Sequence, residues 1–351
     1  MKIGACVLIA SCIFSGVTSF SPSTGFRPSL MSVRRSSGVG LQMEDDAVEE
    51  SSEHIRSRRE VLSEAAFMMV GMTAAFGKPA LADEADAVGA APVVKKPKMV
   101  MVAGATGQTG RRILERLADG SSEWDAVVAG VRNVDKATKS LGESSTVIRG
   151  AMVQNVPGIA DSKKVSLKQL DVVSNSVSQM VETSLDGVEA LVIAVGFVPG
   201  NPLKMNAAAH AVDNVGTCAL IDAAKQAGVK KVVLVSSILT NGRAWGQENS
   251  PGFVVTNAFG KVLDEKLVAE NYLKASGMDW TIVRPGGLKA QPPAGELFIS
   301  GEDTLNSGEV SRDLVADVCV ASLTDPKASN KVLEIIEKDD TEPKVFNGLV
   351  M

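Results

Sequence analysis

The most constraining feature of this chain is the stretch from Val100 to Arg112, where an apolar run meets a cluster of glycines. The run ends at Gly104, two more glycines follow at three-residue spacing, and apolar residues then recur at helical spacing from Ile113. This order predicts a strand, a tight glycine turn and the start of a helix. Without side chains in the turn, backbone N–H groups and the positive helix end can approach a pyrophosphate.

The turn therefore predicts a dinucleotide site, and we expect its contacts to come from Gly104, Thr106, Gly107, Gln108, Thr109 and Gly110. The alternative is an ordinary strand-turn-helix whose glycines are spaced by chance. A strand pattern precedes the turn and a helical pattern follows it. This context favours the binding site, because the motif depends on it.

Composition narrows the class of partner. The chain has 351 residues and a formal net charge of −5, so we expect a small-molecule substrate and no nucleic-acid partner. Its four cysteines and two histidines show no metal-ligand spacing, and no metal site is predicted. Cys218 and Cys319 fall in apolar helical patterns, which indicates buried thiols rather than a disulfide.

The N-terminal part has the composition of targeting segments. Residues 1–20 resemble a signal peptide, residues 21–57 a plastid transit region, and residues 58–82 a twin-arginine-like second signal or an anchor. A linker over residues 83–98 follows. A two-part leader of this kind is typical of algae with plastids of secondary origin.

Three destinations stay open for the mature protein within the plastid. The second signal predicts delivery to the thylakoid lumen, whereas an anchoring segment would hold a thylakoid-associated domain in the stroma. The third alternative is a transit-peptide helix with a chance arginine pair. An acidic cluster after Met43 also fits the start of a processed stromal form.

Beyond the linker, apolar runs alternate with helical patterns. The runs predict strands over residues 99–103, 125–131, 166–171, 190–195, 231–236, 280–284 and 332–336. The patterns between them predict helices over residues 108–118, 176–184, 206–227, 257–276 and 311–323. This alternation indicates an α/β fold, a single doubly wound Rossmann domain over residues 99–340 with a mostly parallel sheet. Residues 150–164 are predicted to form an inserted surface loop, and residues 341–351 a tail.

Ligands of such a sheet bind at the carboxyl ends of its strands, which directs attention to the residues there. Arg132 follows the second strand and is expected to contact a 2′-phosphate, with Lys136 or Arg111 as helpers, so NADP rather than NAD is predicted. The alternative is a solvated surface arginine. Asp171 ends the third strand and is expected either to accept from the adenine amine or to cap a helix.

Two further strand ends are expected to face the nicotinamide half of the cofactor. Ala194 and Gly196 lie at the end of the fourth strand, where a glycine permits close approach to a ribose. Pro285 and Gly286 follow the sixth strand in a turn whose backbone N–H groups are expected to bind the nicotinamide amide.

Catalytic roles are predicted for Ser236 and Lys266. Ser236 ends the fifth strand and is expected to hydrogen-bond a substrate carbonyl. Lys266 lies on the next helix and is expected to reach the nicotinamide ribose. The alternative for this lysine is an exposed helix cation. His210 is interpreted as a helix-surface histidine rather than an acid.

Together these residues resemble the short-chain dehydrogenase/reductase superfamily in its atypical branch. The matching marks are the glycine turn, Arg132, Asp171, Ser236-Ser237 and the stretch from Val283 to Gly286. The resemblance is to plastid and cyanobacterial NAD(P)-binding domain proteins, related to the dehydrogenase-like subunit of the chloroplast import apparatus and to flavin or biliverdin reductases. It implies the Rossmann fold and a preference for NADP.

One departure from the superfamily bears on mechanism. Its well-studied dehydrogenases use Tyr-x-x-x-Lys, in which the tyrosine is the acid/base. Here Val262 precedes Lys266 by four residues, Asn257 precedes Lys261, and the chain's one tyrosine, Tyr272, lies further along the helix. The usual acid is therefore absent from its expected position.

Two functions are compatible with this pattern. The first is an NADPH-dependent oxidoreductase of a plastid metabolite (a quinone, flavin, tetrapyrrole or isoprenoid) that takes its proton from the substrate or solvent. The second is a non-catalytic NADP-binding redox-sensing or assembly factor at the thylakoid, in contact with the membrane or a photosynthetic complex. The enzyme is favoured because dinucleotide folds more often serve chemistry. Fold alone does not decide between the two.

Overall fold

The computed structural model describes residues 96–142, 145–149, 152–156, 158–159, 162–338 and 340–350. The predicted signal peptide, transit region, second signal and most of the linker lie outside these described residues. Within those ranges, no helix combines the length and the apolar character that crossing a membrane requires.

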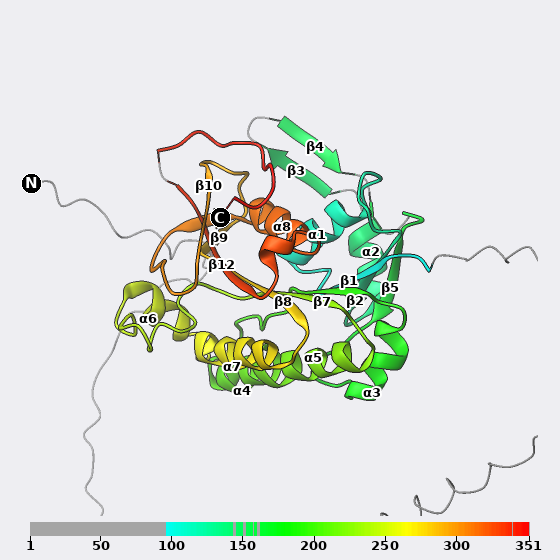
Figure 1. The fold of residues 1–351 in the computed structure, drawn as a ribbon, viewed down its shortest axis with the longest axis horizontal. Helices are drawn as coiled ribbons and strands as arrows, with labels where there is room; N and C mark the ends of the chain where they lie inside the picture. The colour runs from blue at the N-terminus through cyan, green and yellow to red at the C-terminus, as the bar shows by residue number, and fades with distance from the viewer. Residues whose placement is uncertain are drawn as a thin grey trace, which may run out of the picture. The chain divides into compact units, whose positions relative to one another are not determined.

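The central element is an eight-stranded sheet with the spatial order β10-β12-β8-β7-β6-β1-β2-β5 (Figure 1). All neighbouring strands are parallel except β10, which runs antiparallel to β12. The predicted mostly parallel sheet is therefore confirmed. The strands are β1 (Met99–Ala103), β2 (Ala126–Val131), β5 (Val165–Gln169), β6 (Ala190–Ile193), β7 (Lys231–Val235), β8 (Asp279–Pro285), β10 (Leu297–Ser300) and β12 (Lys331–Glu337).

Strand β1 shows why the sequence reads as continuous apolar runs. Val100 and Val102 point into one hydrophobic cluster, and Met101 and Ala103 point into another on the opposite face. A strand that is covered on both faces needs apolar residues at every position, whereas a half-exposed strand would alternate. The apolar runs therefore indicate where the strands lie, and β1 has its predicted bounds.

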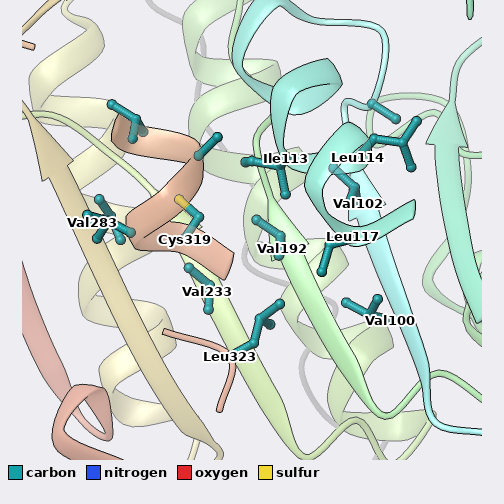
Figure 2. Close-up of a cluster of buried hydrophobic side chains, with 14 of the residues drawn as sticks. Val100, Val102, Ile113, Leu114, Leu117, Val192, Val233, Val283, Cys319 and Leu323 are labelled. Carbon is teal, nitrogen blue, oxygen red and sulfur yellow. The ribbon is translucent and has the colours of Figure 1, made fainter. Parts of the chain in front are cut away.

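Helices cover both faces of the sheet (Figure 1). One layer holds α1 (Gln108–Ala118), α2 (Val134–Gly142) and α8 (Arg312–Ala321), and the other holds α3 (Val177–Met180), α5 (Thr217–Gln226) and α7 (Val262–Ala275). Figure 2 shows Ile113 and Leu117 of α1 and Cys319 of α8 in the cluster with Val192 of β6. Cys319 is buried, Cys218 is half-buried, and both thiols are free, as predicted.

The long helical pattern between β6 and β7 is interrupted. It consists of α4 (Met205–Ala209), the π-helical segment η3 (His210–Gly216) and α5. π-Helical turns re-aim side chains and often occur at functional sites. Here the segment carries Asp213, which is only 2% exposed.

Two predicted elements are wrong in part. The helix predicted over residues 257–276 begins only at Val262, because residues 251–257 form the separate helix α6 (Pro251–Asn257). Between them Gly260 and Lys261 have φ values of 75° and 58°, and a Cβ at Gly260 would lie 2.6 Å from the Met205 carbonyl oxygen. The loop predicted over residues 150–164 instead contains β4 (Met152–Val156), which pairs antiparallel with β3 (Ser145–Arg149).

Short elements complete the described fold. Strand β9 (Gly287–Lys289) pairs in parallel with β11 (Glu309–Ser311), immediately after the end of β8. The π-helical η1 (Val181–Leu185) continues α3, and two 3₁₀ turns are η2 (Pro202–Lys204) and η4 (Pro326–Ala328).

Candidate functional site

The site is built where the order of the strands reverses. The chain passes from β1 through α1 to β2 on one side, and it returns to β6 on the other side of β1. Ala194 N donates to Ala103 O at 3.0 Å, and Gly104 N donates to Gly130 O at 3.1 Å. The carboxyl ends of three strands therefore meet at one point, which is where open α/β sheets bind their ligands.

Two of the three glycines in the turn are required by the packing of the chain on itself. Gly104 has a φ of 81°, and a Cβ there would lie 2.6 Å from the Ala194 carbonyl oxygen. A Cβ at Gly110 would overlap the Gly104 carbonyl. At Gly107 the nearest protein atom would be 3.2 Å away, and the backbone is extended. The absence of a side chain at Gly107 therefore keeps open the space in front of helix α1.

The start of α1 offers uncompensated hydrogen-bond donors. Gly107 is the N-cap residue, no side chain caps the helix, and its first turn contains no acidic residue. The first N–H groups of a helix lack partners within the helix and carry partial positive charge. A diphosphate placed before Gly107 would satisfy them, so the residues present fit the phosphates of a dinucleotide.

Arg132 and Asp171 lie together beside this turn. Arg132 is exposed at the end of β2. The Asp171 carboxylate accepts from Ser174 Oγ at 2.5 Å and from Val173 N at 3.0 Å. The Ser174 hydrogen bond and, to a smaller extent, the Arg132 charge hold the pKa of Asp171 below its ordinary value.

The interpretation of Asp171 as a helix cap is wrong. The N-cap of α3 is Ser176, whose side chain accepts from Gln179 N in a capping box. Asp171 instead stabilises the turn that precedes this helix, because its side chain bonds residues two and three positions ahead. Its contact with adenine stays a prediction.

Lys266 and Asp213 form an ion pair at the end of β6. The distance from Lys266 Nζ to Asp213 Oδ1 is 2.8 Å, and the Asp213 side chain is fully buried. Asp213 Oδ2 accepts from Phe197 N at 3.1 Å. A Cβ at Gly196 would lie 4.0 Å from Lys266 Nζ. Lys266 is therefore not an isolated surface cation, because it lies against the segment predicted to adjoin the nicotinamide ribose.

Ser236 lies in a buried network rather than alone at a strand end. Its hydroxyl donates to Glu270 Oε1 at 2.5 Å, and the residue is 7% exposed. Thr240 Oγ1 donates to the same oxygen at 3.0 Å. Since a serine hydroxyl has one proton, a substrate carbonyl would have to compete with Glu270 for it. The predicted role of Ser236 toward a substrate stays a prediction.

Arg284 is the centre of that network and is fully buried. It donates to Glu270 Oε2 at 2.6 Å, to Asp303 Oδ1 at 2.8 Å and to Glu334 Oε1 at 3.2 Å. Burial alone would lower the pKa of Arg284, but the hydrogen bonds and charges of Glu270 and Asp303 outweigh it and raise the pKa. The guanidinium thus joins α7, β8 and β12 below the carboxyl edge of the sheet.

The turn after β8 does not offer the predicted donors. Gly286 N donates to Ile335 O and Gly287 N donates to Gly308 O, both at 2.9 Å. Pro285 has no N–H group. The prediction that these backbone N–H groups bind a nicotinamide amide is therefore wrong, because β12 and the residue before β11 already accept from them.

The remaining candidate acids lie on the outer face of the helices. Tyr272 Oη donates to Asp222 at 2.7 Å, and Asp222 raises the pKa of the tyrosine. His210 Nδ1 lies 3.0 Å from Glu265 Oε2, and the histidine side chain is 56% exposed. Val262 is buried at the start of α7. Among these described residues, no tyrosine takes the position four residues before Lys266.

Comparison with known proteins places this site in a family. The family described as NAD(P)H-binding matches residues 104–326. An uncharacterised chloroplastic protein of Arabidopsis thaliana is 42% identical over 258 residues, which cover 72% of this chain and 82% of that protein. The protein TIC 62 of Pisum sativum is 31% identical over 69% of this chain. This chain spans 43% of the length of that relative.

More distant similarities agree with the fold. Sanguinarine reductase of Eschscholzia californica is 27% identical, with coverage of 70% of this chain and 91% of that protein. A solved oxidoreductase structure from Lactococcus lactis superposes with a TM-score of 0.52 at 22% identity, and the match covers 68% of this chain and 91% of that one. At that identity the superposition shows the fold alone.

Sequence analysis missed the acidic partners at the site. Three buried carboxylates hold residues of the candidate site or their neighbours. Asp213 pairs with Lys266, Glu270 accepts from Ser236, and Glu334 accepts from Arg284, the residue before Pro285. Glu270 and Glu334 interrupt apolar patterns, and a charge in such a pattern is the signal that could have indicated a buried ion pair. Asp213 gave a weaker signal, since a π-helical turn shifts the helical period around it.

Proposed function

Since the chain belongs to the NAD(P)H-binding family, we propose that it is an NADPH-dependent reductase of a plastid metabolite, of the atypical short-chain dehydrogenase/reductase type. The acceptor classes proposed are a quinone, a flavin, a tetrapyrrole and an isoprenoid. One observation carries the proposal. A glycine turn that fits a diphosphate and the Lys266 ammonium both adjoin the segment from Ala194 to Gly196.

In this proposal, different residues of the chain bind different parts of the cofactor. The N–H groups at the start of α1, those of Gln108, Thr109 and Gly110, bind the diphosphate, and Thr106 lies beside it. Gly104 and Gly107 shape the turn, because their own N–H groups already donate to Gly130 O and Gly104 O. Arg132 contacts the 2′-phosphate, which selects NADPH over NADH. Ala194 and Gly196 leave room for the ribose that Lys266 contacts.

Bound NADPH supplies a hydride, so the acceptor needs one proton as well to complete a two-electron reduction. Val262 has no proton to give, and the Ser236 proton is shared with Glu270. The Lys266 ammonium, whose side chain is 19% exposed, orients the ribose. Solvent is then the proton source, a requirement that conjugated acceptors meet because their reduced anions are stable enough to be protonated afterwards.

The compartment is proposed from the relatives and the leader together. The Arabidopsis and pea relatives are chloroplastic proteins, and residues 1–82 have the composition of plastid targeting segments. We propose a plastid of secondary origin, with the domain in the lumen or beside the thylakoid in the stroma. Mass spectrometry of the native N-terminus tests this, since a start near Asp83 supports lumen delivery and one near Met43 supports the stroma.

The second candidate is a nucleotide-binding redox sensor or assembly factor at the thylakoid. Two observations favour it, the valine at position 262 and the engagement of the Ser236 hydroxyl by Glu270. Both reduce the number of side chains that can deliver a proton to a substrate.

Stopped-flow absorbance at the nicotinamide band separates the two candidates. Full-length chain and NADPH are mixed with menadione, flavin mononucleotide or biliverdin, and a reductase oxidises NADPH with at least one of them. Calorimetry on the same preparation measures NADPH binding. Tight binding without oxidation by any acceptor would favour the sensor, and the absence of binding would contradict both candidates.

A further inference from the structure

An arginine cluster lies where α1 packs beside α8 (Figure 1). Arg112 and Arg116 belong to α1, and Arg312 is the first residue of α8. The ion pairs within the cluster come from two carboxylates of α8. Asp317 Oδ1 lies 2.5 Å from Arg116 Nε, whereas Asp313 Oδ1 is shared between Arg116 Nη2 at 3.3 Å and Arg112 Nε at 3.5 Å. The closest ion pairs therefore belong to Arg116.

Arg312 is the member of the cluster without an ion pair. It pairs with no carboxylate in the part of the chain that the structure describes, and its Nη1 donates to Leu288 O at 3.2 Å. Burial lowers the pKa of Arg312, and the nearby charge of Arg112 lowers it further. Since a guanidinium has several N–H donors, Arg312 keeps donors for an anion that would offset both charges.

Arg112 brings the second guanidinium to the same place. Its Nη1 donates to Gln108 O at 2.8 Å and its Nη2 to Ala290 O at 3.5 Å. Leu288, whose carbonyl accepts from Arg312, is two residues before Ala290. The two guanidiniums thus lie along β9 and the residue that follows it. Both stay within reach of solvent, since the Arg112 side chain is 20% exposed and Arg312 is half-buried.

These guanidiniums lie at the carboxyl edge of the sheet, beside the glycine turn. Helices α1 and α8 run in the same direction, because the ion pair of Arg112 with Asp313 is followed, one turn later, by that of Arg116. Both helices therefore begin at this edge, and both contribute partial positive charge there. Gln108, which accepts from Arg112, is the first residue of α1. The pair adjoins the N–H groups proposed to bind the diphosphate.

The proximity of Arg112 and Arg312 is unfavourable in the free protein. Like charges that are held close together repel each other, and partial burial weakens the screening that water provides. Arrangements that cost stability in this way are expected at functional sites. A phosphate suits this pair, because its oxygens match the planar fork of a guanidinium and its negative charge offsets the two positive ones.

We infer that Arg112 and Arg312 together bind a phosphate group beside the first turn of α1. Two phosphates have this chemistry, that of the cofactor's diphosphate and one carried by the acceptor. The inference rests on the proposed function, in which backbone N–H groups alone bind the diphosphate, and it adds two cationic side chains to that edge of the site.

Inorganic pyrophosphate is the probe, and calorimetry on the full-length chain measures its affinity. Arg312→Gln removes one guanidinium, so the affinity should fall about tenfold or more, as for a lost charged hydrogen bond. Arg112→Gln should act in the same direction. Lys327→Gln removes an exposed lysine of η4, before the amino end of β12, and as the matched control it should change the affinity little. A parent chain that binds no pyrophosphate, or an Arg312→Gln chain that binds it as the parent does, overturns the inference.

Two further measurements separate binding from a structural role of Arg312. Arg312→Lys keeps the charge and loses the planar fork, so it should recover part of the pyrophosphate affinity; it also carries the test if Arg312→Gln does not fold. Urea unfolding of Arg312→Gln should show no large loss of stability, because the repulsion from Arg112 is relieved. Lower stability with unchanged pyrophosphate affinity would instead mean that Arg312 only holds the Leu288 carbonyl.

NADPH identifies the source of the phosphate. If the cofactor's diphosphate fills the site, saturating NADPH abolishes pyrophosphate binding, and Arg312→Gln weakens NADPH and NADH by the same factor. That result differs from the change of ratio expected for Arg132. If the phosphate belongs to the acceptor, pyrophosphate still binds to the NADPH-saturated chain and still depends on Arg312, and the affinity for NADPH is unchanged.

The same measurements distinguish this inference from the proposed function. Pyrophosphate binding that depends on Arg312, in a chain without affinity for NADPH, supports the phosphate site and contradicts the proposed function. A chain that binds and oxidises NADPH, and whose pyrophosphate affinity neither arginine affects, overturns the phosphate site alone.

Discussion

Lys266 on α7 and Asp213 on η3 form an ion pair in which the carboxylate is fully buried and the ammonium side chain is 19% exposed. The pair joins the helix after β7 to the helical segment after β6, directly beside Gly196. Asp213 thus fixes the ammonium from within the protein and leaves its outer side free to contact a ligand. The position of Lys266 depends on a residue that is 53 positions earlier in the sequence.

Removing the ammonium from this pair should be costly. Lys266→Met leaves the buried Asp213 charge unpaired, so the free energy of unfolding should fall by about 3–5 kcal/mol, less whatever the partial exposure of Lys266 screens. Lys230→Met is the matched control, since that lysine is 75% exposed and pairs with Glu189. We expect the control to cost at most about 1 kcal/mol. Urea unfolding measures both, and equal losses would contradict the structural role of the pair.

Substitutions at two glycines of the turn should affect different properties: Gly104→Ala the stability of the fold, and Gly107→Ala the binding of NADPH. Gly104→Ala meets the Ala194 carbonyl at a positive φ, and the backbone conformation alone costs about 1–2 kcal/mol. Gly107→Ala keeps an ordinary extended backbone and meets the Gly104 carbonyl oxygen at 3.2 Å, so it should lower the free energy of unfolding less than Gly104→Ala does. It should nevertheless weaken NADPH binding, because its methyl group projects into the space before α1. Thermal unfolding compares the stability of the two variants, and calorimetry measures their affinity for NADPH. Unchanged NADPH affinity in Gly107→Ala would contradict the diphosphate site.

Arg132 should set the choice between the two nicotinamide cofactors. Arg132→Asp removes a cation from the expected 2′-phosphate and places a carboxylate where a free 2′-hydroxyl can donate to it. The ratio of NADPH to NADH affinity should fall by about tenfold to hundredfold, as for a lost charged hydrogen bond. Lys139→Asp, on the last turn of α2, makes the same charge change elsewhere. An equal fall of this affinity ratio in both variants would show a general effect of charge and would contradict the contact between Arg132 and the 2′-phosphate.

Glu337 should make the stability of the domain depend on acid pH. Burial raises the pKa of its carboxyl, but hydrogen bonds from Ala294 N and Ser311 N and the ammonium of Lys289 outweigh burial and lower it below 4.5. Because the folded-state pKa is the lower one, the carboxylate stabilises the fold fully above pH 4.5, and this contribution is lost as pH falls through the folded pKa.

Unfolding free energies measured across that acid range check the contribution of Glu337. Glu337→Gln should be less stable than the parent near pH 7 and should show a flatter loss of stability below pH 4.5. Glu342→Gln, which changes an exposed carboxylate nearby, should follow the parent. A parent-like slope in Glu337→Gln would contradict this assignment.

The sheet and the glycine turn could be predicted because their causes are local. A strand covered on both faces must be apolar throughout, and Gly104 and Gly110 are needed wherever this turn forms, so β1 and α1 have their predicted bounds. The break between α6 and α7 could not be predicted in the same way. It depends on the approach of Gly260 to the backbone of Met205, a contact between segments distant in sequence.

The polar part of the site was predicted least well, for a related reason. Ser236 and Pro285-Gly286 were correctly placed at strand ends, but hydrogen-bonding capacity depends on which neighbours already use it. Glu270 engages the Ser236 hydroxyl, and Ile335 O engages the Gly286 N–H. Glu270 lies on α7 and Ile335 on β12, both later in the sequence than the strand ends that they contact. A pattern that identifies a strand end does not identify these hydrogen-bond partners.

The two free thiols described above lie in different helical layers, Cys218 on α5 and Cys319 on α8. Burial raises the pKa of Cys319 to about 12, and burial together with the charge of Asp222 raises that of Cys218 to about 11. Since the thiolate is the reactive form, alkylating reagents will reach the buried Cys319 mainly when α8 separates from the sheet, whereas the half-buried Cys218 is partly accessible in the folded domain. The rate at which Cys319 is labelled thus reports the local opening of the α8 layer, with Cys218 as a reference within the same chain and without any engineered reporter.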